Sequence, residues 1–149
     1  MSVIVTDHGF TRDDWPAAPV SFDNFNHDPA TRDATALDLP GDTPPEEIEG
    51  RLAALTHIRI AIPGFGDGRG LTLARQLRRM GFQGRLRAQG PVIADQYTML
   101  RRSGFDEVEI PQALAARQPE SDWLARADWR APSYQAILQG TKKKQVANT

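Results

Sequence analysis

The chain of 149 residues contains no cysteine, and this absence excludes disulfides, iron–sulfur ligation, thiolate metal sites and thiol redox catalysis. Any redox role would need a borrowed cofactor, whose identity the sequence leaves open. An apolar run of signal-peptide or membrane-spanning length is also lacking, so we expect a cytoplasmic protein that uses no membrane. The three histidines, His8, His27 and His57, have no metal-ligand spacing, and no metal site is expected.

An excess of charge of either sign is lacking as well, because the net charge is −1. Nothing in this balance calls for nucleic acid. The charges are unevenly distributed, however: residues 64–104 contain eight Arg and two Asp, a net charge of +6, and the rest of the chain therefore carries −7. A basic region of this kind can attract anions or an acidic partner protein through its field.

The apolar periodicity predicts one α/β domain over residues 1–140, with a mostly parallel sheet built from βα units and helices packed on it. Its core is residues 36–128. Within the core we expect strands at 36–39, 57–63, 85–88 and 105–110, and helices from 44, at 70–80, at 92–102 and at 113–127.

The two ends of the chain are expected to lie outside this core. Residues 1–35 predict a small edge hairpin, formed by 3–5 and 10–15, and then an irregular lead-in from 23 to 35. Asp42 or Thr43 would cap the helix that follows residue 43. Residues 141–149 are polar and lysine-rich and are expected to form a disordered tail.

A repeated segment marks two helix ends. Residues 77–82 read Leu-Arg-Arg-Met-Gly-Phe, and residues 100–105 read Leu-Arg-Arg-Ser-Gly-Phe. Gly81 and Gly104 suit the left-handed position that closes a helix, and the Phe that follows can pack back on the last turn. The Arg pairs are explained most simply as charges that are favourable at helix C-termini, and Arg78 and Arg79 are expected to face outward.

A glycine-rich turn, residues 64–70, follows the clearest strand and precedes a helix. Its backbone N–H groups could hold an anion, with Gly66, Gly68 and Arg69 as ligands. The spacing fits neither a Walker loop nor a dinucleotide fingerprint. An equally good interpretation is that Asp67 caps the helix and the glycines serve the turn.

Polar residues of the next βα unit suggest that it shares this site. Arg87 ends a strand, and a guanidinium can hold an oxyanion by paired hydrogen bonds. Asp95 and Gln96 follow in the first turns of the next helix. Because ligands of α/β sheets bind outside the carboxyl ends of the strands, we expect these residues to meet Asp67 and Arg69 at one rim. The alternatives are a surface ion-pair network for Arg87 and a helix-dipole role for Asp95.

The aromatic residues near the C-terminus allow two interpretations. Trp123, Trp129 and Tyr134 could form a docking surface, but aromatic side chains that follow an amphipathic helix more often close the core. We therefore favour the core interpretation for them.

Residues 65–106 are similar to the bacterial domain of unknown function 934 family. Two departures are Thr72, where the family often has serine, and Ser103, where it often has cysteine. The residues that carry the resemblance are 65–70 (Phe-Gly-Asp-Gly-Arg-Gly), Ala74, Leu77, Arg78, 81–84 (Gly-Phe-Gln-Gly), Leu86, Arg87, Ala88, Gly90, Asp95, Gln96, Arg102 and 104–106 (Gly-Phe-Asp).

The resemblance implies a pathway more than a reaction. Members of the family are usually encoded beside assimilatory sulfite reductase and are often labelled as oxidoreductases of sulfite reduction. The leading hypothesis is therefore an accessory protein that binds the reductase or an acidic electron donor through its basic helices, and a small oxyanion at the rim.

Two other hypotheses stay open. One is an enzyme with Asp67 or Asp95 as general base and with Arg69 or Arg87 holding an oxyanionic substrate or a cofactor phosphate. The other treats the polar residues as an internal network, which an Asp67–Arg87 pair would mark. The hairpin's Asp13, Asp14 and Trp15 could reach the rim in any of these cases.

Overall fold

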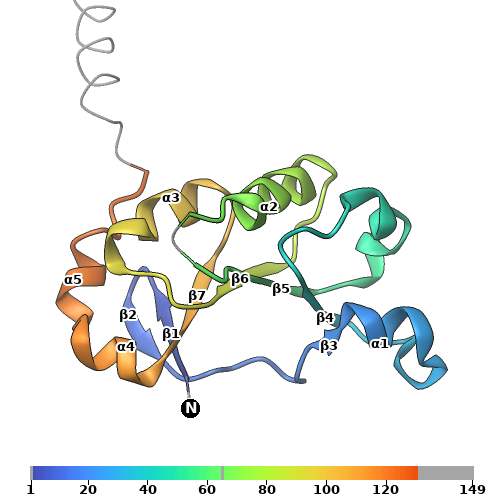
Figure 1. Cartoon of the computed structure of the whole chain (residues 1–149), viewed down its shortest axis with the longest axis horizontal. Helices are drawn as coiled ribbons and strands as arrows, with labels where there is room; N and C mark the ends of the chain where they lie inside the picture. Colours follow the sequence, from blue (N-terminus) through green and yellow to red (C-terminus); the bar gives the residue numbers. More distant parts are fainter. Residues whose placement is uncertain (1, 65, 131–149) are drawn as a thin grey trace, which may run out of the picture.

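A computed structural model of the chain describes residues 2–64 and 66–130. Its strands are β1 (Ser2–Thr6), β2 (Gly9–Thr11), β3 (Val20–Ser21), β4 (Ala36–Leu39), β5 (His57–Ala61), β6 (Arg85–Gln89) and β7 (Glu107–Pro111). They form one seven-stranded sheet in the order β2-β1-β7-β6-β5-β4-β3 (Figure 1). Strands β3 to β7 are parallel, and β1 and β2 are antiparallel additions. The predicted α/β fold with a mostly parallel sheet is confirmed.

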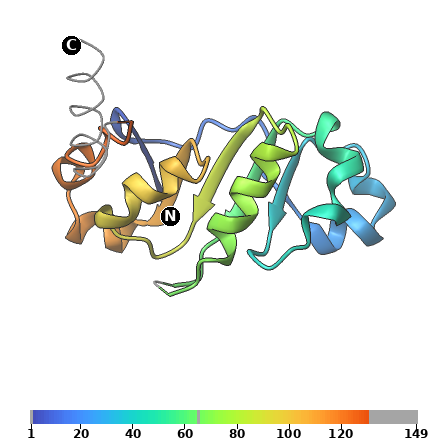
Figure 2. The same ribbon diagram turned by 90° about the horizontal axis from the view of Figure 1, so that it is seen from above.

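Short helices connect the strands. They are α1 (Phe22–His27), α2 (Arg69–Arg79), α3 (Tyr97–Arg102), α4 (Gln112–Arg117) and α5 (Glu120–Leu124), with 3₁₀ helices η1 (Pro29–Thr31), η2 (Pro45–Glu47), η3 (Glu49–Ala54) and η4 (Ala94–Gln96). Helices α2 and α3 lie on one face of the sheet (Figures 1 and 2), α1 lies beside β3 and β4, and α4 and α5 lie beside β1 and β2. Over the described ranges, we find no helix with the length and apolarity needed to span a membrane.

The two faces of the sheet differ in character because side chains alternate along each strand. In β5, Ile58 and Ile60 are fully buried in the core, whereas Arg59 lies on the opposite face. The in-register neighbours repeat this alternation, so the apolar face also contains Leu37, Leu39, Leu86, Ala88, Val108 and Ile110. Parallel sheets are usually apolar on both faces, and the charged second face is therefore the distinguishing feature of this fold.

The repeated helix ends form as the sequence predicts. Gly81 follows α2 with φ +100°, and Gly104 follows α3 with φ +114°. The N–H of Phe82 donates to the carbonyl of Leu77 at 3.0 Å, which is the hydrogen bond that closes a helix through a left-handed residue. Phe82 and Phe105 are buried in the core.

The N-terminal region departs from the prediction in two ways. The hairpin forms, but its second strand ends at Thr11, so residues 12–19 leave the sheet, and β1 pairs along β7 as an inner strand. The irregular lead-in predicted for residues 23–35 is wrong in part, because α1 and η1 occupy much of it, and the short strand β3 before it pairs with β4. Ser21 caps α1 by accepting the N–H of Asn24 at 3.2 Å.

The helix predicted after residue 43 forms as two 3₁₀ helices, η2 and η3, with Pro44 in the capping position. The predicted caps are therefore wrong: the hydroxyl of Thr43 donates to the carbonyl of Pro40 at 2.7 Å instead. Two consecutive prolines bring no backbone donors that need a cap. The buried stripe is as predicted, with Ile48, Leu52 and Leu55 in the core.

Two further helices are interrupted. The helix predicted at 92–102 begins as η4, and the helix predicted at 113–127 is divided into α4 and α5. The division falls at Gln118 and Pro119, because proline supplies no N–H to continue the helix. The predicted tail, residues 141–149, and Tyr134 lie outside the described residues.

Candidate functional site

The glycine-rich turn, residues 64–70, lies at the carboxyl end of β5 and leads into α2. Asp67 is paired there with Arg69: its Oδ2 lies 2.8 Å from Nη2, and its Oδ1 accepts the backbone N–H of Arg69 at 3.0 Å. The side chain of Arg69, and then its backbone N–H, lower the pKa of Asp67 from 3.8 to about 2. Asp67 thus accepts the first backbone N–H of α2 from a position before the N-cap residue, Gly68, and its carboxylate is a weak base.

Gly66 and Gly68 of this turn are not required by packing, whereas a Cβ on Gly70 would lie 2.4 Å from Cδ1 of Ile62. A Cβ added to Gly66 or Gly68 would meet no described atom within 4 Å. Both residues are exposed. The turn therefore presents an open backbone surface beside the first turn of α2.

Arg87 does not lie at this rim, and the expected juxtaposition with Asp67 is wrong. Its side chain is 0% exposed and belongs to the charged face of the sheet. Nε and Nη2 donate to Oε2 of Glu107 at 2.9 and 2.7 Å, and Nη1 donates to Glu109 at 3.1 Å. The reason is the register of β6, which places Arg87 in the row of Arg59, two residues before the strand ends.

Asp95 and Gln96 do lie at the rim, in η4. Asp95 pairs with Arg126 at 2.6 Å, and both side chains are at least half exposed. The Oε1 of Gln96 accepts the backbone N–H of Ile93 at 3.1 Å, which closes a capping contact around η4. The structure therefore brings Asp67, Arg69, Asp95 and Gln96 to one edge, and among the described residues each of them except the NH₂ of Gln96 has a partner.

The charged sheet face consists of Asp38, Arg59, Arg85, Arg87, Glu107 and Glu109, with Gln89 beside them. The Nη2 of Arg59 lies 2.6 Å from Oδ2 of Asp38, and its Nη1 lies 3.2 Å from Oε1 of Glu109. Charges of alternating sign therefore run across β4, β5 and β7. Glu107 also pairs with Arg85. Side chains of Glu107 and Glu109 are 2% and 8% exposed. The three arginines and three carboxylates balance, which buried charges require.

A segment after the hairpin, residues 13–15 (the crossing segment), crosses this face. Asp13 pairs with Arg87 at 3.0 Å and Asp14 with Arg85 at 2.9 Å, and each arginine lowers the pKa of its carboxyl partner. The ring of Trp15 lies 3.9 Å from the Arg87 guanidinium carbon, a cation–π contact, and its indole N–H is buried without a partner among the described residues. These three residues therefore contact the charged sheet face, whereas the sequence suggested that they could reach the rim.

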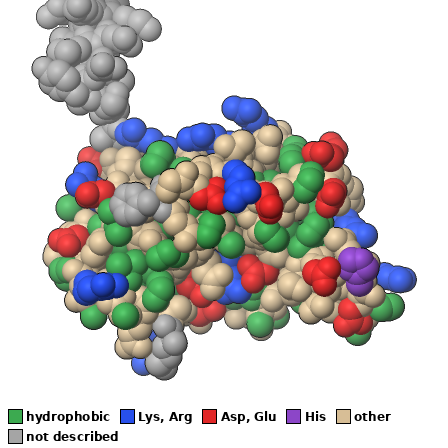
Figure 3. Space-filling view, viewed as in Figure 1, with side chains coloured by type: hydrophobic (Ala, Val, Ile, Leu, Met, Phe, Trp, Pro, Cys, Tyr) green, Lys and Arg blue, Asp and Glu red, His purple; other side chains and the backbone are tan. Residues whose placement is uncertain are grey.

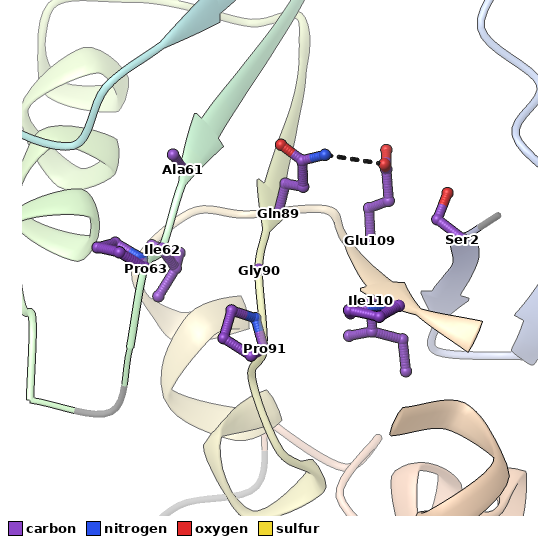
Figure 4. A pocket seen from close by; sticks show the side chains of 10 residues that line it. Ser2, Ala61, Ile62, Pro63, Gln89, Gly90, Pro91, Glu109 and Ile110 are labelled. Atoms are coloured by element: carbon purple, nitrogen blue, oxygen red, sulfur yellow. Dashed lines mark hydrogen bonds between the residues drawn. The ribbon is translucent and has the colours of Figure 1, made fainter. Parts of the chain in front are cut away.

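A groove runs along the carboxyl edge of the charged sheet face (Figure 4). Gln89 and Glu109 face one another in it, and the amide Nε2 donates to the carboxylate at 3.1 Å. A Cβ on Gly90 would lie 1.9 Å from the carbonyl oxygen of Ile62. The close approach of these two backbone segments beside the groove therefore requires glycine at position 90. The cavity of about 490 Å³ is lined by Ser2, Ala61, Ile62, Pro63, Gln89, Gly90, Pro91, Glu109, Ile110 and Pro111.

A second hollow lies on the helix side, between α2 and α3. Its volume is about 310 Å³, and it is bounded by Gly66, Asp67 and Gly68 of the turn. Met99 and Arg75 are exposed at its edge. Figure 3 shows Lys and Arg side chains standing clear along the edge formed by the helices, whereas others nearer the centre of the view are flanked by acidic groups.

The arginines of residues 64–104 have different roles, and the prediction that Arg78 faces outward is wrong. Arg78 is half-buried and donates to the carbonyls of Gly104, Phe82 and Gly84 at 2.9, 3.0 and 2.8 Å, whereas its neighbour Arg79 is exposed. Arg101 pairs with Asp7 at 3.1 Å.

The charged sheet face was not predicted, although a signal for it exists. Arg85 and Arg87 are two residues apart, as are Glu107 and Glu109, which is the spacing of one face of a strand. Trp123, by contrast, is 1% exposed and meets Tyr97 edge to face, so the core interpretation is confirmed for it.

Comparison with known proteins gives a family but no activity. No curated protein matches the chain. A family model described as a bacterial protein of unknown function, DUF934, matches residues 36–143. This range includes strands β4 to β7, the glycine-rich turn and the charged sheet face except for the crossing segment. The chain therefore belongs to the DUF934 family, as the resemblance predicts.

Proposed function

We propose that this protein is a non-catalytic accessory protein of assimilatory sulfite reduction, which binds sulfite reductase or its electron donor. The observation that carries the proposal is the pairing of the candidate catalytic groups within the chain. Asp67 is held by Arg69, Asp95 by Arg126, and Arg87 by buried carboxylates. The sulfite-reduction context comes from the family resemblance.

The charge on α2 supports a binding role. Arg75 and Arg79 are exposed, and within 2–64 and 66–130 neither has an ion-pair partner. A patch of uncompensated cations raises the association rate with an acidic protein, and this effect weakens as salt increases. Most other arginines of residues 64–104 are paired with carboxylates of the chain, so the uncompensated positive charge is concentrated on α2.

A small oxyanion at the rim is a secondary part of the proposal. The open turn at Gly66 and Gly68 and the guanidinium of Arg69 are the groups that would hold it. Such an anion would compete with the carboxylate of Asp67 for Arg69. We therefore expect weak binding at the rim.

The alternative is an oxidoreductase or another small-molecule enzyme that uses Asp67 or Asp95 with Arg69 or Arg87 and a borrowed cofactor. An efficient general base has a pKa near the working pH. Asp67, with its pKa of about 2, is far from that value. Arg87 would also have to leave its buried carboxylates before it could reach a substrate.

The test is a binding and rate measurement with purified proteins. The full chain is immobilised, and sulfite reductase and its electron donor are passed over it at low and at physiological salt. The rate of sulfite reduction is then measured with and without the chain. We expect binding that weakens with salt and a changed rate of sulfite reduction, and Asp67→Asn and Asp95→Asn should not abolish the change in rate.

Two results would contradict this proposal. Absence of binding to both proteins at low salt, with an unchanged rate, would reject the accessory role. Normal binding with a rate effect that Asp67→Asn or Asp95→Asn abolishes would support the enzyme alternative instead.

A further inference from the structure

We infer that the hollow between α2 and α3 is the docking site for an acidic segment of the partner that carries one large apolar side chain. This inference rests on the proposed function, because it assumes that the chain has a protein partner. It adds where the partner binds and which chemistry the site recognises.

The hollow has an apolar floor. Ile62, Val92 and Leu100 line it and are each no more than 2% exposed. Its volume of about 310 Å³ is at the lower limit of ligand pockets. A space of this size and lining suits one bulky apolar side chain better than a nucleotide or a flavin.

Met99 gives this floor an exposed extension. Its side chain is 48% exposed, and among the described residues only Leu124 is a comparable exposed large hydrophobic residue, at 42%. Methionine is flexible and polarisable, so it adapts to the shape of an incoming side chain. Apolar anchors that enter such pockets dominate the energy of many protein interfaces.

The edge of the hollow is cationic. Arg75 lines it, and Arg79 is exposed one turn further along α2. The carboxylate of Asp67 also lines it but is neutralised by Arg69. An acidic residue beside the apolar anchor would therefore gain a charge partner at Arg75, whereas a basic residue there would be repelled.

Two polar groups complete the edge. The carbonyl oxygen of Gln96 accepts the N–H of Ile93, and its NH₂ makes no hydrogen bond to a described residue, so it can donate to a carbonyl or carboxylate of the partner. The hydroxyl of Thr72 donates to the carbonyl of Gly68 and can still accept. An apolar floor with a polar rim is the usual anatomy of a protein interface.

The experiment uses two acidic peptides as probes, in addition to the partner protein. Both peptides are twelve residues long, labelled with fluorescein and rich in Asp and Glu. One has a central Phe, and its twin has Ser in that position. We expect the Phe peptide to bind the wild-type chain, in fluorescence anisotropy, at least tenfold more tightly than the Ser peptide.

Variants of the hollow are compared with matched variants elsewhere. Met99→Ser and Arg75→Glu should each weaken binding of the Phe peptide and of the partner at least tenfold. Leu124→Ser places the same loss of apolar surface on the other exposed large hydrophobic residue of the described chain, and Arg117→Glu places the same charge reversal on α4. Both controls should stay within twofold of wild type, and circular dichroism checks that all four fold.

The outcomes separate this inference from the proposed function. If the partner binds the wild-type chain and binds Met99→Ser and Arg75→Glu equally well, the docking site is wrong and the accessory role stands. If the two peptides bind with equal affinity, the apolar anchor is wrong. If neither partner protein binds the wild-type chain while the Phe peptide does, the proposed partner is wrong and the docking site stands.

Discussion

The two faces of the sheet use arginine in opposite ways. On the charged sheet face, Arg87 is fully buried and contacts three carboxylates, whereas on the helix side Arg75 is exposed and has no ion-pair partner among the described residues. Buried, paired charges fix one arrangement of strands at little net gain in stability. Exposed, uncompensated charges do little for stability and remain available for a partner. This difference is the reason why we propose the helix side, and not the charged sheet face, as the surface that binds a partner.

The largest expected effect is the removal of a buried charge. Arg87→Ala leaves Glu107 and Glu109 without one of their cationic partners in a buried site. Breaking a buried pair costs about 3–5 kcal/mol. Urea unfolding followed by circular dichroism measures the loss, with Arg75→Ala as the exposed control, for which we expect a change within about 0.5 kcal/mol. Equal effects of the two substitutions would remove the distinction between the faces.

A second prediction divides neighbouring arginines of the helix side. Arg78→Ala removes donors to three carbonyls and to Asp106, so we expect a loss of about 2–3 kcal/mol. Arg79→Ala should change stability by less than about 0.5 kcal/mol, because Arg79 is exposed. Thermal unfolding of both variants provides the comparison, and a loss of stability in Arg79→Ala similar to that in Arg78→Ala would contradict it.

A third prediction concerns the segment that crosses the charged sheet face. Trp15→Ala removes the ring above Arg87 and should cost about 1–2 kcal/mol. Trp15→Phe retains a ring and removes the buried indole N–H that lacks a partner, so it should cost less than Trp15→Ala. A Phe variant less stable than the Ala variant in urea unfolding would show that the ring does not stabilise Arg87.

The smallest expected effect is a pH dependence. Burial, and then the charge of Arg85, lower the pKa of His57 below 6.5. Below pH 6.5 the unfolded chain therefore binds more protons at His57 than the folded chain does, and stability falls as the pH falls toward the folded pKa. His57→Gln should flatten this part of a stability profile measured from pH 8 to pH 5. An unchanged slope would place the titrating group elsewhere.

Carboxylates of the crossing segment titrate in a separate range. Arg87 and Arg85 lower the pKa values of Asp13 and Asp14 below 3.8. Their contribution is present above pH 3.8 and is lost as the pH falls through the folded values. Both side chains are about half exposed or more, so the effect is small and should decrease further in salt.

Local patterns in the sequence were sufficient for the strands and helix ends of the core. The alternation of Ile58 and Ile60 with Arg59 predicts both β5 and the face it buries, and Gly81 and Gly104 predict where two helices end. These features depend on residues close together in the chain. The 3₁₀ helices and the break at Pro119 were harder to predict, because tight turns and proline change the hydrogen bonding without changing the apolar period.

The candidate site shows the limit of this approach. Asp67, Arg69, Asp95 and Gln96 reach the predicted edge because strand order and direction place all βα loops together. Arg87 does not reach it, because the register of β6 places this residue two positions before the end of the strand and on the charged sheet face. Its partners Asp13, Glu107 and Glu109 are 74, 20 and 22 residues away in the chain.

The sequence by itself determined the α/β class, the apolar face of the sheet and the concentration of arginine in residues 64–104. Only the tertiary structure decided which arginines are neutralised and which remain open, because that depends on carboxylates from distant segments such as Asp7, Asp13 and Asp38. A charge is read directly from the sequence, but its field depends on where its counter-charge lies in space.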